Sequence, residues 1–352
     1  MKKRILISVV VLLLLGILLW LLQLLVVPKY TDNREGALIG EYYSEAGGHD
    51  VIFVGDCEIY ESFIPATLWE EYGITSYLRG SPQQLVWQSY YLLEETFRYE
   101  KPGAVVYNVL ALKYGEPQSE SFNRMTLDGM KWSSSKADAI RASMTEEESF
   151  LDYLFPFLRY HSRITELTGD DFKYAFSDPP TVSHSGYLMQ TDVLPMTKEE
   201  RESAEEGRNL SDYTLPETAM EYLDRMRQLC EENGAELILV KAPTNTWAYW
   251  WYDEWEEQID EYADAHGLSY YNFIPLCDEI GIDWNTDTYD KNVHLNVYGA
   301  EKLSRYFGEI LSRDHGIADR RADAETAAVW DERLLRFQED KRKSEMERNQ
   351  AE

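Results

Sequence analysis

The chain has 352 residues with 63 acidic and 34 basic side chains, which gives a formal net charge of −29. Such acidity argues against a nucleic-acid partner, because there is no basic field to release counterions from phosphate. The apolar content of 44% is enough to fill the core of one large α/β domain or two ordinary ones. We expect the surface acid mainly to keep the domain soluble.

The N-terminus carries the clearest local signal. Three basic residues at 2–4 precede an apolar run over 5–27 that contains only Ser8 and Gln23 as polar positions. At 1.5 Å per residue this run spans about 34 Å, which is enough to cross a bilayer. It is longer than the apolar core of a cleavable signal peptide and lacks a small-x-small cleavage site. We therefore predict an uncleaved, single-pass signal anchor over 1–28 in the cell membrane, with the rest of the chain extracytoplasmic.

Strand and helix patterns alternate after a connecting segment. Val51 to Val54 is a short apolar run typical of a buried strand, whereas 83–100 carries apolar residues at helical spacing. Pro65 interrupts one helical pattern and Gly73 ends it. The expected elements are an amphipathic helix near 38–43, a strand at 51–54, a helix ending at Tyr72, a strand at 74–78, a helix at 83–100 and a strand at 104–110.

The alternation stops over residues 111–213, where helical segments and polar loops replace strand signals. Thr145 to Glu148 has the sequence of a capping box and predicts a helix from there to about Leu167. We interpret the whole stretch as a mainly helical insertion that forms a cap or a lid over the site.

The alternation then resumes. The expected elements are a helix at 216–233, a strand at 235–241, a helix at 252–266, a strand at 268–272 and a helix at 296–313 with Asn296 as its N-cap. Five strands in this order predict a flavodoxin-like, doubly wound parallel sheet, whose ligands bind beyond the carboxyl ends of the strands. We assign this α/β domain to 29–318. The remaining 319–352 is a charged tail, expected to be a solvated helix, with a partner-binding role left open.

Two segments carry candidate chemistry. The first strand ends on Gly55-Asp56-Cys57, a tight turn that can present a nucleophilic thiol. His294 stands just before the last helix, four residues after Asp290, and an acid so placed can orient an imidazole as a base. The alternatives remain open, because Cys57 can be a small buried residue and a histidine near a helix start is often structural.

Taken together, these segments resemble the SGNH (GDSL-type) hydrolases. The landmarks in chain order are Gly55-Asp56-Cys57 after the first strand, Gly80 after the second, Asn108 after the third, and Asp290 with His294 before the last helix. The resemblance implies that Cys57 replaces the usual serine nucleophile, His294 is the base and Asp290 orients it. It also implies that Gly80 and Asn108 complete an oxyanion hole. The chain departs from the family pattern at Cys57, in the longer Asp-x-x-x-His spacing, and in lacking Gly and Asp beside Asn108.

The resemblance is strongest to the membrane-anchored branch of Gram-positive bacteria. It implies an acyl transferase or esterase that acts on O-acyl groups, acetyl in the first place, of a cell-surface glycan or wall polymer. A thioester passes its acyl group readily to an alcohol or water, which favours transfer slightly. The alternative is a non-catalytic module of the same fold that binds a glycan or serves as a scaffold for a membrane-bound acyltransferase.

Candidate substrate-binding residues are placed by the strand ends. Asp56 is expected to fix the turn, and Trp250 and Trp251 belong to an aromatic cluster after the fourth strand that is suited either to stacking on sugar rings or to packing under the insertion. Lys241, Arg79 and Lys113 also lie near strand ends and are expected to meet an anionic polymer. We expect no metal and no cofactor, because the six histidines are scattered and no Cys-x-x-Cys, His-Glu-x-x-His or Gly-rich phosphate loop is present. The other cysteines, Cys230 and Cys277, are expected to be small buried hydrophobes, with a disulfide between them left open.

Overall fold

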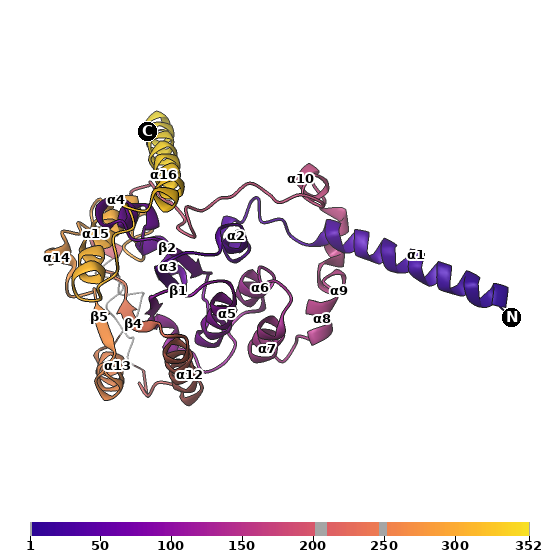
Figure 1. The fold of residues 1–352 in the computed structure, drawn as a ribbon, viewed down its shortest axis with the longest axis horizontal. Helices are drawn as coiled ribbons and strands as arrows, with labels where there is room; N and C mark the ends of the chain where they lie inside the picture. The colour runs from indigo at the N-terminus through magenta and orange to yellow at the C-terminus, as the bar shows by residue number, and fades with distance from the viewer. Residues whose placement is uncertain (1, 201–209, 246–251, 352) are drawn as a thin grey trace.

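The computed structural model describes residues 2–200, 210–245 and 252–351 and is built around one parallel sheet (Figure 1). Its strands are β1 (Val51–Gly55), β2 (Ser76–Gly80), β3 (Ala104–Asn108), β4 (Glu236–Lys241) and β5 (Ser269–Asn272). Their order is β2-β1-β3-β4-β5 and every described pairing is parallel. The predicted flavodoxin-like α/β sheet is confirmed, although β2 begins two residues later than expected.

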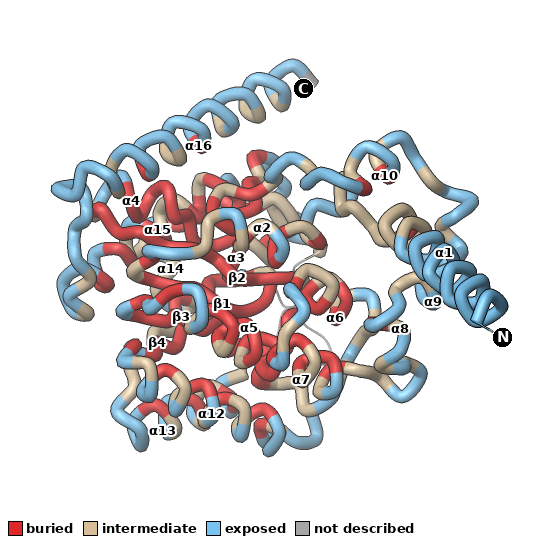
Figure 2. Tube along the Cα trace, turned by 45° about the vertical axis from the view of Figure 1, so that its right-hand side comes forward, coloured by how far each residue is buried: buried red, intermediate tan, exposed pale blue. Residues whose placement is uncertain are grey.

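Helices cover both faces of the sheet, which explains why the inner strands β1 and β3 are mainly apolar runs. Ile52 and Val54 point into a core shared with α5 (Val86–Tyr99), α12 (Glu217–Asn233) and α13 (Asp253–His266). Val51 and Phe53 point the other way, into a core shared with α3 (Cys57–Ser62), α4 (Pro65–Tyr72) and α15 (Val297–Arg313). The buried positions in Figure 2 follow the strands and the inner sides of these helices. The carboxyl ends of β1 and β3 are thereby fixed by packing on both sides.

Local signals set the ends of several helices. Gly73 and Gly267 adopt left-handed conformations that end α4 and α13, as their sequence positions predict. The Asn296 side chain accepts hydrogen bonds from the Tyr298 and Gly299 amides and caps α15, which confirms the predicted N-cap. The shorter helical segments near the sheet are η1 (Arg34–Ala37), α2 (Leu38–Glu45), η2 (Val109–Lys113) and α14 (Cys277–Ile280).

The insertion is helical but differs from its prediction. Its elements are α6 (Glu120–Leu127), α7 (Ser134–Ser143), α8 (Phe150–Leu154), α9 (Phe157–Tyr160), η3 (His161–Thr165) and α10 (Gly169–Lys173). The single helix expected from Thr145 to Leu167 is wrong. Glu148 does accept a hydrogen bond from the Thr145 amide, but this pair closes an isolated turn. The helix begins only at Phe150, and Pro156, which has no N–H to donate, separates α8 from α9.

An extended segment connects the insertion to the rest of the domain. The Leu188 amide donates to the Tyr60 carbonyl in α3, and the Val297 amide at the start of α15 donates to the Gln190 carbonyl. The Leu194 amide bonds the Thr288 carbonyl in the loop before α15. Described residues of the insertion between Gln190 and Glu200 therefore hydrogen-bond to this loop and to the start of α15.

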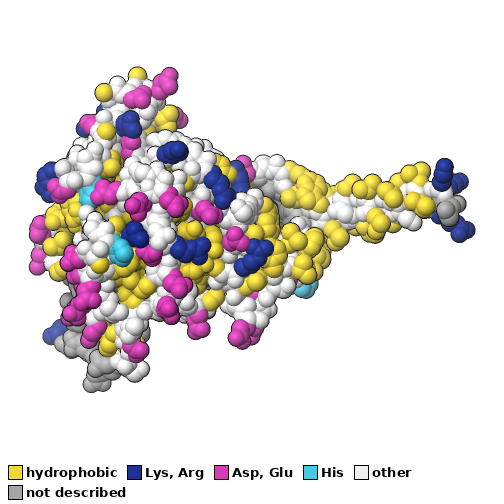
Figure 3. Space-filling view, turned by 60° about the horizontal axis from the view of Figure 1, so that its bottom comes forward, with side chains coloured by type: hydrophobic (Ala, Val, Ile, Leu, Met, Phe, Trp, Pro, Cys, Tyr) yellow, Lys and Arg dark blue, Asp and Glu magenta, His cyan; other side chains and the backbone are white. Residues whose placement is uncertain are grey.

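Two long helices extend from the domain. α1 (Lys2–Val26) projects from it with apolar side chains along its length and basic ones at its tip (Figure 3). Among the described residues it is the one helix long and apolar enough to cross a membrane. α16 (Ala324–Ala351) confirms the predicted charged helical tail. The expectation that it is fully solvated is wrong for its first half, where Trp330 and Phe337 are only 4% and 3% exposed.

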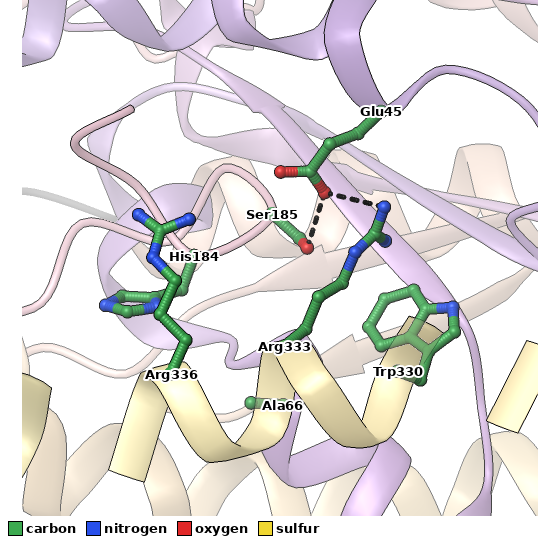
Figure 4. A pocket seen from close by; sticks show the side chains of 7 residues that line it. All are labelled: Glu45, Ala66, His184, Ser185, Trp330, Arg333 and Arg336. Atoms are coloured by element: carbon green, nitrogen blue, oxygen red, sulfur yellow. Dashed lines mark hydrogen bonds and ion pairs between the residues drawn. The ribbon is translucent and has the colours of Figure 1, made fainter. Parts of the chain in front are cut away.

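A small polar pocket marks where α16 docks on the domain (Figure 4). Glu45 on α2 accepts a hydrogen bond from the Ser185 hydroxyl at 2.9 Å and lies 3.2 Å from Arg333 on α16. Arg336 donates to the Thr181 and Ser183 carbonyls. Because these charged groups are used to hold the helix, we assign the pocket a structural role.

Candidate active site

The Gly55-Asp56-Cys57 turn begins at the carboxyl end of β1. Gly55 has φ +153°, and a Cβ added to it would lie 2.8 Å from an Ile59 side-chain carbon and 3.2 Å from the Asn108 Cβ. The Asp56 carboxylate accepts from the Glu58 amide at 3.2 Å and caps α3. Cys57 thus becomes the first residue of α3 and stays partly exposed.

The structure brings Cys57, His294 and Asp290 together. His294 Nε2 lies 3.1 Å from the Cys57 Sγ, and His294 Nδ1 lies 2.6 Å from Asp290 Oδ2. The other Asp290 oxygen accepts from the His294 backbone amide at 2.8 Å, so one carboxylate holds both the ring and its backbone. With Nδ1–H donating to Asp290, Nε2 is left to accept the thiol proton. This is the geometry that a thiol nucleophile and its base require.

The loop before α15 absorbs the long Asp-x-x-x-His spacing. Lys291 and Asn292 both have positive φ, at 65° and 68°, which is uncommon for residues other than glycine. The Asn292 amide donates to the Thr288 hydroxyl at 3.0 Å, and its side-chain oxygen accepts from the Met196 amide at 3.1 Å. Lys291 and Asn292, both left-handed, therefore accommodate the one residue by which the Asp-x-x-x-His spacing exceeds the usual one. The His294 ring still points toward Cys57.

Glu61 is a second acid at this site that the sequence prediction missed. Its Oε1 accepts from the Tyr289 hydroxyl at 2.7 Å, and its Oε2 lies 3.3 Å from His294 Nδ1. Tyr289 also lies nearly parallel to the imidazole, with the ring planes 19° apart. The sequence spacing could have indicated Glu61, because it follows Cys57 by four residues and so lies on the same face of α3.

Burial and charge act on the protons of this cluster. Burial raises the pKa of Glu61 to about 7, although the imidazole opposes the shift. Burial also raises the pKa of the Cys57 thiol, against the lowering effect of His294. For His294, burial favours the neutral ring, but Glu61, the Cys57 thiolate and Asp290 outweigh it and raise its pKa well above the usual value. The imidazolium is therefore stabilised, and the neutral ring that can accept the thiol proton becomes more populated as the pH rises.

Asn108 and Lys241 belong to a buried network beneath the turn. The Asn108 amide nitrogen donates to Asp56 at 3.1 Å and to Glu58 at 2.7 Å, and its oxygen accepts from the Ala242 amide. Lys241 Nζ lies 2.6 Å from Glu58 and has no exposed surface. Burial, followed by the charge of Glu58, raises the pKa of Asp56 to about 7. The expected contact of Lys241 with a polymer is therefore wrong, and Asn108 directs its amide hydrogens at carboxylates.

The remaining predicted positions are placed as follows. Gly80 lies in β2 opposite Gly55. A Cβ added to Gly80 would lie 3.0 Å from a Tyr60 ring carbon and 3.2 Å from the Asp56 carbonyl oxygen. The turn can therefore approach β2 this closely only because position 80 is a glycine. Arg79 is fully buried and donates to Glu95, which makes the expected polymer contact wrong here too. Trp250 and Trp251 lie outside the described residues.

The cysteines and potential metal ligands complete the description of the site. All three cysteines are free, with Cys230 buried as expected and Cys277 only partly buried. Within the described ranges, no group of three or more His, Cys, Asp or Glu side chains is placed to hold a metal ion.

No protein-family model matches the chain, and no curated protein matches it either.

Proposed function

We propose that this chain is a membrane-anchored, extracytoplasmic SGNH-like acyl transferase or esterase. In this proposal α1 is the single-pass anchor, and the substrate is an O-acyl group on a cell-surface glycan or wall polymer. The observation that carries the proposal is the pair of contacts at His294, 3.1 Å to the Cys57 Sγ and 2.6 Å to Asp290. Cys57 follows a parallel strand at its carboxyl end, where ligands of doubly wound sheets bind.

The proposed reaction uses one thioester intermediate. Cys57 Sγ attacks the acyl carbonyl while His294 Nε2 takes the thiol proton, and Asp290 stabilises the resulting imidazolium. The tetrahedral intermediate collapses by breaking the bond to the leaving alcohol, which receives the proton from His294. An acceptor hydroxyl or water then attacks the thioester, again with His294 as base, and Cys57 regains its proton. Acceptance by a hydroxyl is transfer, and acceptance by water is hydrolysis.

The oxyanion in this reaction requires hydrogen-bond donors. The backbone amides of Cys57 and Gly80 are the proposed donors, because both residues border the turn. Asn108 can join them only if its amide leaves Asp56 or Glu58, to which it donates at 3.1 and 2.7 Å. Substrate binding would therefore have to rearrange the buried network before a third donor became available.

These same contacts favour a second candidate function. With Asn108 held by two carboxylates and the thiol pKa raised by burial, the site also suits a non-catalytic module. Such a module would bind a glycan or act as a scaffold for a membrane-bound acyltransferase. The two functions differ in whether Cys57 carries an acyl group during turnover.

Ester hydrolysis by the full-length protein in lipid nanodiscs tests the enzyme proposal. Wild type is expected to release the chromophore of an acetyl ester above background, whereas Cys57→Ala and His294→Ala should lose this release. Cys277→Ala is the matched control, because it removes another partly exposed thiol that lies outside the site. Equal release by wild type, Cys57→Ala and His294→Ala would refute the enzyme proposal and favour the non-catalytic function.

A further inference from the structure

The helices of the insertion that adjoin α1 expose large apolar side chains. Over residues 150–176, six of them are 48–72% exposed. They are Leu151, Phe155, Leu158, Ile164, Phe172 and Phe176. In Figure 3 the apolar surface of α1 continues onto the adjoining part of the domain at the base of the helix. Large apolar groups gathered in this way mark an interaction surface.

This segment is attached to the last turns of α1. The Phe176 ring contacts the Trp20 ring edge-on, with 6.4 Å between centroids. Arg163 donates to the Val26 carbonyl at the end of α1 and also pairs with Asp171 at 3.0 Å. Val26 is fully buried, whereas residues 5–20 of α1 remain exposed. The segment therefore packs beside one end of α1 and leaves the rest exposed (Figure 1).

The length of α1 sets the depth of this contact. A bilayer with a hydrocarbon core of about 30 Å takes up about 20 residues of helix. If the hydrocarbon core of the bilayer begins just after the basic residues at 2–4, these roughly 20 residues of helix extend past Trp20. Trp20 precedes Val26 by six residues, or about 9 Å of helix. Phe176, which contacts Trp20, must then lie below the outer membrane surface, where its neighbours meet lipid.

The charge of the segment fits the same location. Residues 150–176 hold three basic and four acidic side chains, so their net charge is 3 − 4 = −1, against −29 for the chain. The basic residues are Arg159, Arg163 and Lys173, and the acidic ones are Asp152, Glu166, Asp170 and Asp171. An anionic membrane surface repels a nearly neutral segment less than it repels the strongly acidic protein as a whole.

We propose that residues 150–176 form an interfacial membrane foot, which seats α8, α9 and α10 in the outer leaflet beside α1. The foot adds a second attachment to the anchor and fixes the height and tilt of the Cys57 site above the membrane. This inference rests on the proposed anchoring by α1. The occupant of the apolar surface is phospholipid, because the contact between Phe176 and Trp20 holds the foot at membrane depth.

Photo-crosslinking tests the foot in the full-length protein. Phe155, Phe172, Leu12 and Leu335 are replaced one at a time by p-benzoylphenylalanine. The variants are irradiated in nanodiscs of phosphatidylcholine and phosphatidylglycerol, and in cell membranes. Leu12 reports the anchor, and Leu335 on α16 is the matched control, since it is 59% exposed, as is Phe172. All four positions are exposed, so each variant should fold.

The expected result is a phospholipid adduct at Phe155 and Phe172 in nanodiscs, at least about tenfold above the yield at Leu335. Adducts at Leu12 without adducts at Phe155 and Phe172 would overturn the foot and leave the anchor intact. Absence of adducts at Leu12 would instead overturn the anchor and the foot with it. Adducts to protein in place of lipid at Phe155 and Phe172 in cell membranes would show a protein-binding surface and also overturn the proposal.

Discussion

The second acid at His294 leads to a prediction that does not depend on the substrate. Glu61→Gln keeps the size of the side chain and its acceptor for the Tyr289 hydroxyl, but removes the charge 3.3 Å from His294 Nδ1. That charge stabilises the imidazolium, so removing it must lower the pKa of His294. Asp290 remains in place and keeps the ring oriented through its 2.6 Å contact.

The size of the effect follows from the distance. Two unit charges 3.3 Å apart attract by about 5 kcal/mol at an effective dielectric constant of about 20. This is an upper bound, because the imidazolium charge is shared between two nitrogens and Glu61, with a pKa of about 7, is only partly ionised at neutral pH. We therefore expect the pKa of His294 to fall by about one to two units, in the range of a single close opposite charge.

Carbon-13 NMR of labelled histidine rings measures this shift in the full-length protein. Six histidines are present, and the signal of His294 is identified by its loss in His294→Gln. Glu45→Gln is the matched control, because the Glu45 carboxylate pairs with Arg333 rather than with an imidazole. An unchanged titration of His294 in Glu61→Gln, or an equal shift in Glu45→Gln, would refute the role assigned to Glu61.

Three further changes test the turn and the C-terminal helix. The raised pKa of Asp56, about 7, means that its protonated form contributes stability below about pH 4 that is lost as the pH rises through 7. Chemical denaturation should therefore show Asp56→Asn gaining stability relative to wild type over this window, by up to about 4 kcal/mol, and a pH-independent difference would contradict this. Gly55→Ala should lower the free energy of unfolding by about 2–4 kcal/mol through backbone strain and overlap with Ile59, and an unchanged melting temperature would count against it. Phe337→Ala should loosen α16 by about 3 kcal/mol and increase its cleavage by trypsin, whereas the exposed Leu335→Ala should not.

The fold was predictable because its signals are local. The inner strands β1 and β3 are mainly apolar runs. Gly73 and Gly267 end helices and Asn296 begins one, as their sequence positions predict. The break between α8 and α9 in the insertion was also predictable from the sequence, because Pro156 lies inside the span 145–167 expected to be one helix. A capping-box pattern such as that at Thr145 can close a single turn, whereas a proline inside the span ends the helix.

The errors at the site come from contacts between distant segments. Lys241 and its partner Glu58 are 183 residues apart, and a lysine at a strand end ordinarily reaches solvent. The order of the landmarks placed Cys57, Asp290 and His294 together, but nothing local shows that the Asn108 amide turns toward Asp56. In α16, Trp330 and Phe337 are seven residues apart on one face, a spacing that predicts a buried stripe once it is sought.

The central claim is that Cys57 carries an acyl group, and trapping that group tests it most directly. The full-length protein is incubated with an activated acetyl ester, quenched in acid and examined by peptide mass spectrometry from neutral to alkaline pH. We predict one acetyl group on Cys57 that hydroxylamine removes, that forms faster as the pH rises, and that is lost in His294→Ala. No acetyl group on Cys57 at any pH, or equal labelling of Cys57 and Cys277 in wild type and His294→Ala, would contradict the claim.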